Sequence, residues 1–431
     1  MPAANGTDIS CEESYALKRD QTDALRDFKA RFHLNPSKIY MDGNSLGVMS
    51  RDAEESLQRV ICEWRDLGIG GWLEGNPPWF GYAERLSESL APLVGAAPHE
   101  IITCGSTTIN IHSLTATFLS MTKNRRVILM DELTFPTDRY AVESQLQVHG
   151  SDPRSNLKTV RSEDGYCLDE DVIIEQMTED VGIVFLPSVL YRSGQLLDIE
   201  KLTKAAHAKG IFIGFDCAHS IGAVPHSLSD WGVDYACWCT YKYLNSGPGG
   251  VGGLYINQRH HGSGPALTGW WGHKKDTQFD MNNTYEPENS AGAWQIGTPH
   301  LFSMAPLAGS LALFTEADIH HVRDKSLQLT EYLMYLAEER LSSYGITIKT
   351  PRRKSQRGGH VALSHPDAIR INEALKASGV IPDFRYPDII RLAPVALYTG
   401  FHDVWKVVDV LTSIMNRESY KAYKKTRKAV A

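Results

Sequence analysis

Short apolar stretches alternate with helical patterns through the middle of the chain. Residues 126–130 (RVILM), 182–186 (GIVFL) and 211–215 (IFIGF) are continuous apolar runs, which are typical of strands buried on both faces. Residues 199–210 have helical spacing and end in a glycine, a common helix stop. This alternation predicts an α/β fold with a mainly parallel central sheet and helices on both faces.

Beyond about residue 300 the pattern changes to longer helices with short strands between them. Residues 305–344 are largely helical in spacing, and residues 367–378 and 404–415 indicate two further helices. This second pattern predicts a smaller α+β unit that follows the α/β part.

Composition narrows the class of protein. The chain has 431 residues, of which 42% are hydrophobic and 22% charged, as in ordinary globular proteins. A net charge of −7 argues against nucleic-acid binding, and the chain has no run of ~20 apolar residues that would span a membrane. The N-terminus lacks the apolar stretch of a signal peptide.

The seven cysteines point to a reducing compartment. Their number is odd and most lie in apolar runs, so we interpret them as buried thiols and expect a cytoplasmic protein. The pair at Cys237 and Cys239 has no second pair of ligands at zinc-site spacing. We therefore expect no metal site.

Two ionisable residues follow apolar runs that are typical of strands. Asp216 follows residues 211–215, and Lys242 follows residues 233–240, with the small residues 247–250 just beyond. Ligands of such sheets bind at the carboxyl ends of the strands, and a charge buried there needs a partner. The alternatives are an aspartate that caps a helix and a lysine that reaches the surface.

An Asp and a Lys at neighbouring strand ends suit a pyridoxal-phosphate (PLP) site. The lysine bonds to the cofactor and moves a proton, while the aspartate keeps the pyridine nitrogen protonated. Residues 105–108 (GSTT) precede a helical pattern and offer N–H groups and hydroxyls to a phosphate, although plain helix capping explains them equally well. Phe135 follows the 126–130 run and suits stacking on a flat ring, although an isolated phenylalanine is more often core.

Six segments together resemble the kynureninase family, whose members are class-V PLP enzymes with a fold-type-I, PLP-dependent transferase-like architecture. The resemblance runs from about residue 38 to 415, and the segment around Lys242 is the most specific. The segments are MDGNSLG (41–47), FPTD (135–138), DCAH (216–219), WGVDYACWCTYKYLNSGPGG (231–250), GWWGH (269–273) and RLAPVALYTGFHDV (391–404). With this resemblance, we expect a large PLP-binding α/β domain over residues 46–300 and a small α+β domain built from residues 1–45 and 301–431.

The resemblance implies a set of site residues. Those with catalytic roles would be Lys242, Tyr241 and Asp216. The cofactor-binding set would be Thr107, Thr108, Phe135, Asp138, Asp216, His219, Tyr241, Lys242, Trp270 and Thr298. The substrate-binding set would be Arg391, which clamps the substrate carboxylate, with Trp72, His273, Asn44 and Ser45. Trp270 and Thr298 would reach the phosphate from a partner subunit, so the resemblance implies a homodimer with shared active sites.

The reaction implied is hydrolysis of L-kynurenine to anthranilate and L-alanine in tryptophan catabolism. The animal-type enzymes that prefer 3-hydroxykynurenine tend to carry His and Asn where Trp72 and Thr298 align, so we expect this chain to prefer unhydroxylated kynurenine. Pro187 is a departure, because relatives often have a hydroxyl residue there. Either Ser188 supplies that hydroxyl or the contact is absent.

Two other functions fit parts of the pattern. One is another class-V PLP enzyme, either an aminotransferase or a cysteine desulfurase, although a desulfurase needs a nucleophilic loop cysteine and this chain has no cysteine after Cys239. The other is a catalytically silent PLP-binding protein. The joint presence of Asp216, Tyr241, Lys242 and Arg391 speaks against it.

Overall fold

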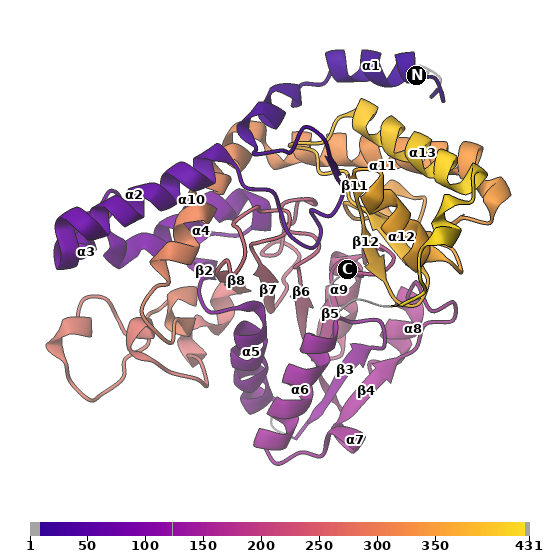
Figure 1. The fold of residues 1–431 in the computed structure, drawn as a ribbon. Helices are drawn as coiled ribbons and strands as arrows, with labels where there is room; N and C mark the ends of the chain where they lie inside the picture. Colours follow the sequence, from indigo (N-terminus) through magenta and orange to yellow (C-terminus); the bar gives the residue numbers. More distant parts are fainter. Residues whose placement is uncertain (1–8, 123, 427–431) are drawn as a thin grey trace, which may run out of the picture.

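A seven-stranded sheet forms the centre of the larger part of the protein, in a computed structural model that describes residues 9–122 and 124–426 (Figure 1). The strand order is β2-β8-β7-β6-β5-β3-β4. Strands β4, β3, β5, β6 and β7 pair in parallel, whereas β8 is antiparallel to both β7 and β2. The strands are β2 (Ile101–Thr103), β3 (Val127–Asp131), β4 (Leu157–Val160), β5 (Val181–Pro187), β6 (Phe212–Asp216), β7 (Tyr235–Cys239) and β8 (Gly252–Ile256).

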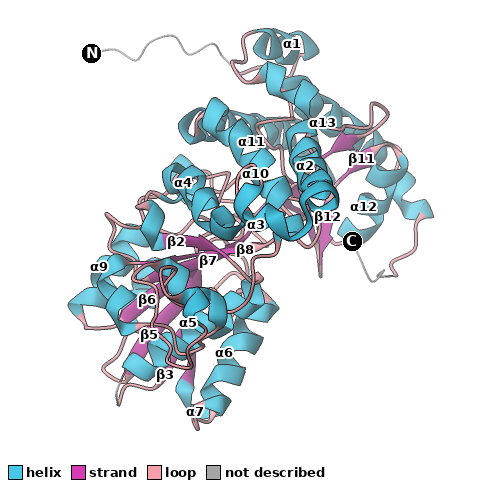
Figure 2. Ribbon diagram, turned by 90° about the vertical axis from the view of Figure 1, so that its left-hand side faces the viewer, coloured by secondary structure: helices cyan, strands magenta, loops and turns pink. Residues whose placement is uncertain are grey.

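Helices cover both faces of this sheet. Figure 2 shows α5 and α6 on one face and α9 on the other. The helices of this part are α2 (Arg51–Leu67), α3 (Gly71–Glu74), α4 (Tyr82–Val94), α5 (Thr107–Met121), α6 (Pro136–Val148), α7 (Pro153–Asn156), α8 (Glu170–Glu175) and α9 (Ile199–Ala208). The predicted fold class is therefore confirmed, with the refinement that one edge of the sheet is antiparallel.

The apolar runs became strands because each can bury both of its faces. Every residue of β5 is buried, as is every residue of β3 and β7. Because helices cover both faces of the sheet, an apolar side chain can be buried at any position of these strands. The chain must still leave each strand at its carboxyl end, and there the first polar side chains appear.

A second core lies beside the first and uses both chain ends. Strand β1 (Ile39–Tyr40) pairs in parallel with β11 (Val380–Ile381), so an early segment joins a late one. An antiparallel sheet has the order β12-β13-β10-β9, from β12 (Asp383–Arg385), β13 (Ile389–Leu392), β10 (Val361–Ser364) and β9 (Thr347–Ile348). The surrounding helices are α1 (Glu13–Gln21), α11 (Ile319–Leu341), α12 (Ala368–Ala377) and α13 (Phe401–Asn416).

Helix α10 (Leu301–Ala317) lies between the two parts of the chain. Its buried residues belong to the core of the seven-stranded sheet, and it packs along α2. The boundaries predicted near residues 45 and 300 stay predictions, and this packing favours a later second boundary. Residues 1–8 and 427–431 of the predicted small domain lie outside the described residues.

Three further observations concern the described residues only. None of their helices is both long and apolar enough to cross a membrane. The seven cysteines, all within the described ranges, form no disulfide. No group of three or more potential metal ligands gathers in this part of the chain.

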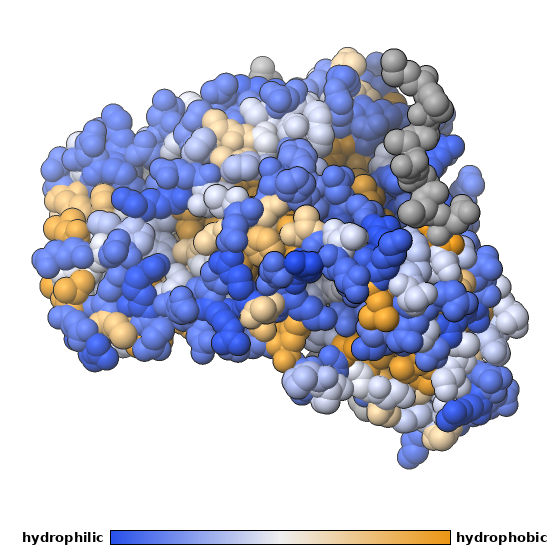
Figure 3. All heavy atoms as spheres, turned by 90° about the horizontal axis from the view of Figure 1, so that it is seen from above, coloured by the Kyte–Doolittle hydropathy of each residue, from blue (hydrophilic) through white to orange (hydrophobic). Residues whose placement is uncertain are grey.

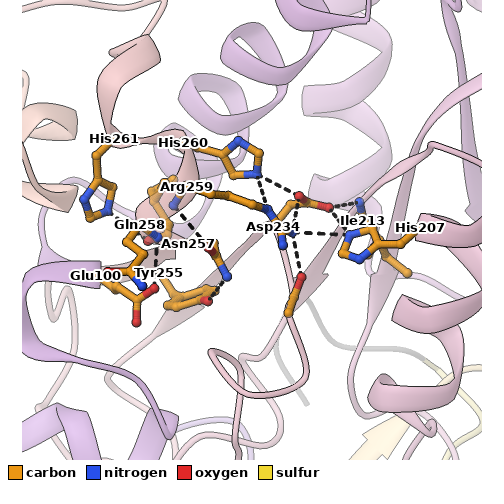
Figure 4. A network of polar contacts seen from close by, with 12 residues as sticks. Glu100, His207, Ile213, Asp234, Tyr255, Asn257, Gln258, Arg259, His260 and His261 are labelled. Carbon is orange, nitrogen blue, oxygen red and sulfur yellow. Dashed lines mark hydrogen bonds and ion pairs between the residues drawn. The ribbon is translucent and has the colours of Figure 1, made fainter.

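A buried carboxylate ties the amino-terminal ends of the central strands together (Figure 4). Asp234, just before β7, accepts the backbone N–H of Ile213 at 2.8 Å and contacts His207 at 2.9 Å through Oδ2. Its Oδ1 contacts Arg259 at 2.5 Å and His260 at 2.7 Å. Although burial opposes ionisation, the hydrogen bonds from the histidines and the charge of Arg259 hold the pKa of Asp234 below its ordinary value.

Replacing Asp234→Asn removes this charge and leaves its partners unmatched. We expect the free energy of unfolding at pH 7 to fall by about 3 kcal/mol, as when a buried ion pair loses one member. Because the pKa of Asp234 is depressed, its contribution is complete above the unfolded-state value and is lost progressively as the pH falls toward the folded-state value. The difference between wild type and variant should therefore begin to shrink below about pH 4. Urea denaturation between pH 3 and pH 8 measures this, and a gap that stays constant with pH would contradict it.

Candidate active site

A cavity of about 270 Å³ lies where the central strands end and the second core begins. The carboxyl ends of β5, β6 and β7 contribute one wall, the start of α5 a second, and β12 and β13 a third. Its lining is Asn44, Ser45, Thr107, Thr108, Phe135, Thr137, Pro187, Val189, Tyr191, Asp216, Ala218, His219, Cys239, Tyr241, Lys242, Arg385 and Arg391. Most of the predicted site residues therefore meet in one place.

Asp216 and Lys242 enter this cavity from adjacent strands. β6 and β7 run in parallel, so Asp216 at the end of β6 and Lys242 just after β7 reach the same edge of the sheet. Burial raises the pKa of Asp216, while the positive charge of Lys242 and the N–H of Ala218, at 2.8 Å from Oδ1, oppose that rise. Lys242 is thus a cavity residue rather than a surface cation.

The ring of Phe135 faces the lysine. Lys242 Nζ lies 5.9 Å from the ring centroid, and Tyr191 meets the same ring edge to face at 5.3 Å between centroids. Because Phe135 is exposed on its cavity side, it is not a core residue. An aromatic face beside an amine suits a flat, conjugated ligand.

A second carboxyl group lies behind Asp216. Burial, followed by the charge of Asp216, raises the pKa of Asp138 well above its ordinary value. The hydroxyl of Thr134 donates to Asp138 Oδ2 at 2.9 Å, while Oδ1 has no partner among the described residues. Two carboxyl groups this close do not readily ionise together, so this environment favours a protonated Asp138.

His219 borders the same space as a neutral imidazole. Burial, followed by the charge of Lys242, lowers the pKa of His219 well below its ordinary value. Its Nδ1 is buried without a partner among the described residues. A buried polar atom of this kind calls for a ligand atom or water.

The start of α5 offers an anion site. Thr107 and Thr108 begin the helix and line the cavity, and the preceding Ser106 makes no side-chain capping bond. Helix capping therefore does not explain this segment. The first N–H groups of a helix lack internal partners and carry partial positive charge, which suits a phosphate. Thr137 adds a hydroxyl 2.7 Å from that of Thr108.

Arg391 approaches from the second core. It is buried on β13, and its Nη1 donates to the Tyr191 carbonyl at 2.7 Å while Nη2 donates to Ser45 Oγ at 2.9 Å. Asn44, next to Ser45, is buried with both side-chain amide atoms unpaired among the described residues. The segment at 41–47 is therefore a wall of the cavity.

Besides Asp138, which lies behind Asp216, four predicted residues lie outside this cavity in a single chain. Trp72 packs against Trp79 and Trp271, and His273 contacts Thr277 Oγ1 at 3.0 Å. Trp270 is exposed, and Thr298 lines another cavity of about 560 Å³ on the far side of the start of α5. One chain thus brings together the predicted lysine, aspartate and arginine, but not these four.

Three residues of the cavity lining and the role of Ser188 become clear only in the folded protein. Tyr191, Thr137 and Arg385 were not predicted. Arg385 shares a face of β12 with Asp383, but this placement depends on the pairing of β12 with β13 and has no local signal. Pro187, the last residue of β5, lines the cavity where relatives often have a hydroxyl residue. Ser188 instead donates to the Asp216 carbonyl at 3.0 Å and contacts Ser220, so it does not supply the missing hydroxyl.

Comparison with known proteins gives the family. A kynureninase from Geobacillus thermodenitrificans is 55% identical over 99% of this chain and 100% of its own length. A kynureninase from Bacillus cereus is 52% identical over 97% of each chain. Residues 322–411 match the family described as kynureninase C-terminal domain. The chain belongs to the kynureninase family.

Solved structures with a similar fold include a cysteine desulfurase and an enzyme with a PLP cofactor. The apo cysteine desulfurase from Thermococcus onnurineus superposes with a TM-score of 0.75 at 17% identity, covering 91% of this chain and 98% of that one. A C-DES variant with glycine covalently linked to its PLP cofactor gives a TM-score of 0.74 at 17% identity, covering 89% and 98%. At this identity the likeness concerns the fold, while the sequence relatives separate the kynureninase family from the desulfurases.

A buried carboxyl group close to Asp138, outside the cavity lining of this kynureninase-family protein, predicts an unusual pH dependence of stability. Burial raises the pKa of Asp131, at the end of β3, to about 7, against an unfolded value of about 3.9. The folded state therefore binds the proton more tightly, and the free energy of unfolding should fall as the pH rises from about 4 to about 7. Asp131→Asn should flatten this part of the profile in urea denaturation, and an unchanged slope would contradict the assignment.

Proposed function

We propose that this protein is a PLP-dependent hydrolase that cleaves the Cβ–Cγ bond of L-kynurenine and yields anthranilate and L-alanine. The observation that carries the proposal is the convergence of Lys242, Asp216 and Arg391 on one cavity in a chain of the kynureninase family. An amine, a carboxylate and a guanidinium there match an amino-acid substrate bound to PLP.

The residues present fit the cofactor. Thr107 and Thr108 would hold its phosphate at the helix start, together with Tyr241, and Phe135 would stack on its ring. Asp216 would pair with the pyridine nitrogen, with the protonated Asp138 behind it and His219 at the ring edge. The unpartnered Nδ1 of His219 supports a ligand in this space.

When bound, PLP supplies an electron sink that stabilises negative charge on substrate carbons. Lys242 would hold the cofactor until the substrate amine takes its place, and the freed Lys242 amine would then accept the proton from the substrate Cα. Water would supply its hydroxyl to the γ-carbonyl carbon, so that cleavage of Cβ–Cγ releases anthranilate and leaves the electron pair on Cβ. Tyr241 would then pass a proton to Cβ and regain one from that water, because burial raises the pKa of Tyr241 and keeps its phenol protonated. Arg391 would hold the α-carboxylate, so that Cα stays within reach of Lys242.

A desulfurase function has less support than hydrolysis of kynurenine. Cys239 is the cysteine that lines the cavity within the described part of the chain. Burial, followed by the charge of Asp216, raises the pKa of Cys239 despite Lys242. A protonated thiol in a buried strand is a poor nucleophile, which does not suit attack on a substrate sulfur.

The activity follows directly from these assignments. The PLP-loaded protein should release anthranilate from L-kynurenine, which its fluorescence reports. Lys242→Ala should lower kcat by at least about 10³-fold, because both the covalent bond and the proton transfer are lost. The exposed Lys204→Ala should match wild type. Normal turnover by Lys242→Ala would contradict the proposal.

The preference between substrates stays a prediction. Trp72 offers an aromatic wall and one donor where 3-hydroxykynurenine enzymes tend to carry His, so kcat/KM should be higher for kynurenine than for 3-hydroxykynurenine. Steady-state assays with both substrates measure this, and the reverse order would refute it.

A homodimer with shared sites is also part of the proposal. Trp270 and Thr298 lie outside the cavity of their own chain, which suits residues that serve a partner's cavity. Apolar side chains reach the surface near α2 and α3, where Ile69 is 85% and Leu73 78% exposed (Figure 3). A second copy of this chain would cover such a surface.

Mixed dimers test the sharing of sites. Lys242→Ala and the double variant Trp270→Ala with Thr298→Ala should each be nearly inactive alone. After refolding as a mixture, their heterodimer should regain one intact site, about half the activity of a wild-type dimer. No regain in a heterodimer purified by two different tags would show that each chain completes its own site.

A cytoplasmic location and a two-domain division at residues 45 and 300 remain proposals. The unpaired cysteines support the first. The two cores of the described residues support a division into two domains, while the packing of α10 favours a second boundary later than residue 300.

A further inference from the structure

Arg391 is a poor clamp for a carboxylate when it acts alone. A guanidinium grips a carboxylate best through two parallel N–H groups. In Arg391, both Nε and Nη2 already contact Asp383 Oδ2, with Nε at 2.5 Å. Nη1 donates to the Tyr191 carbonyl, and the side chain is only 1% exposed. The edge of the guanidinium group that carries Nε and Nη2 therefore faces Asp383 rather than the cavity.

A second arginine lies beside it with a more open side chain. Arg385 is 31% exposed and lines the same cavity. Its Nε donates to Asp383 Oδ2 at 2.8 Å, so one carboxylate oxygen holds both guanidinium groups. The strand register explains the arrangement, because Asp383 lies opposite Arg391 on β13 and shares its face of β12 with Arg385.

The two guanidinium groups converge on one point of the cavity wall. Ser45 Oγ accepts from Arg391 Nη2 at 2.9 Å and from Arg385 Nη2 at 3.3 Å. A neutral hydroxyl oxygen at this point occupies the position that suits a ligand oxygen with a negative charge. A carboxylate oxygen that took this place, with the Ser45 side chain rotated aside, would receive two charge-assisted hydrogen bonds, which are stronger than those to a hydroxyl.

The charges of the cluster favour an incoming anion. Two guanidinium groups outweigh the single carboxylate of Asp383. The other carboxyl group packed against the cluster is Asp42, which a β-bridge to Ala393 brings beside β13. Burial, followed by the charge of Asp383, raises the pKa of Asp42, so this neighbour resists adding a second negative charge.

We propose that Arg385 is a second ligand of the substrate α-carboxylate, acting with Arg391 across Ser45, and that Asp383 positions both guanidinium groups. The inference rests on the proposed function for the identity of the substrate. Arg385 touches the substrate, whereas Asp383 acts only through the two arginines.

The test compares two small ligands of the PLP-loaded protein. L-Alanine carries the amine, the methyl group and the carboxylate, whereas isopropylamine has a second methyl group in place of the carboxylate. In Arg385→Gln, the dissociation constant of L-alanine, measured by the change in cofactor absorbance, should rise about 10- to 100-fold, since a hydrogen bond to a charged group is lost. That of isopropylamine should change less than about twofold, within the range of a neutral change.

Kinetics provide the second readout. KM for L-kynurenine should rise by a similar factor in Arg385→Gln, with a smaller change in kcat. Arg385→Lys keeps the positive charge beside Asp383 but loses the planar set of N–H donors of the guanidinium group, so its effects should be intermediate. Arg353→Gln is the matched control, because Arg353 is exposed and lies outside the cavity. The lysine variant also keeps the test decisive if the glutamine variant fails to fold.

Three results overturn the inference. The first is an Arg385→Gln protein with the alanine affinity and KM of the Arg353→Gln control. The second is equal weakening of L-alanine and isopropylamine, because it would mean that Arg385 only supports the local structure. The third is an Arg385→Lys protein that equals wild type in both readouts. If wild type releases no anthranilate, the proposed function fails, while the alanine and isopropylamine constants still decide the role of Arg385.

Discussion

The site depends on holding an amine and a carboxylate at the buried ends of two adjacent parallel strands. Each of these groups alone would pay a large desolvation cost there, and the carboxyl group shows it in a raised pKa. Parallel pairing of β6 and β7 brings Asp216 and Lys242 to one edge, where each offsets part of the other's cost. Helices on both faces of the sheet exclude water from these strands. Burial there makes each charge costly, so the fold tolerates the two charges only as a pair.

The proposed binding of anions does not rely on a basic chain. The net charge is −7, yet the cavity presents the start of α5 on one side and two arginines on another. Partial charges of a helix start are local and need no lysine. The arginines are kept in place by Asp383, which lowers the cost of burying them and leaves the cluster with a positive balance. Two anionic groups of one reacting complex can thus be held at separate ends of a small space.

The sequence predicted the parts of the site that local patterns encode. Apolar runs identified β3, β5, β6 and β7, and the ionisable residues after the last two of these runs identified Asp216 and Lys242. Arg385 and Tyr191 escaped notice because their roles depend on pairing between β12 and β13 and on a loop after β5, which are long-range contacts without a local signal. The role of Ser188 was open for the same reason: a hydroxyl next to Pro187 points toward Ser220 only once the strands have assembled. The resemblance to kynureninases supplied the roles that geometry alone leaves undefined.

The most direct test of this account asks which lysine bears the cofactor. Reduction of the PLP-loaded protein with borohydride fixes the covalent bond, and mass spectrometry of its peptides then locates the adduct. The account predicts one pyridoxyl group on the peptide that contains Lys242, and none on that peptide in Lys242→Ala. An adduct on another lysine, or a reduced protein without any adduct, would contradict the central claim.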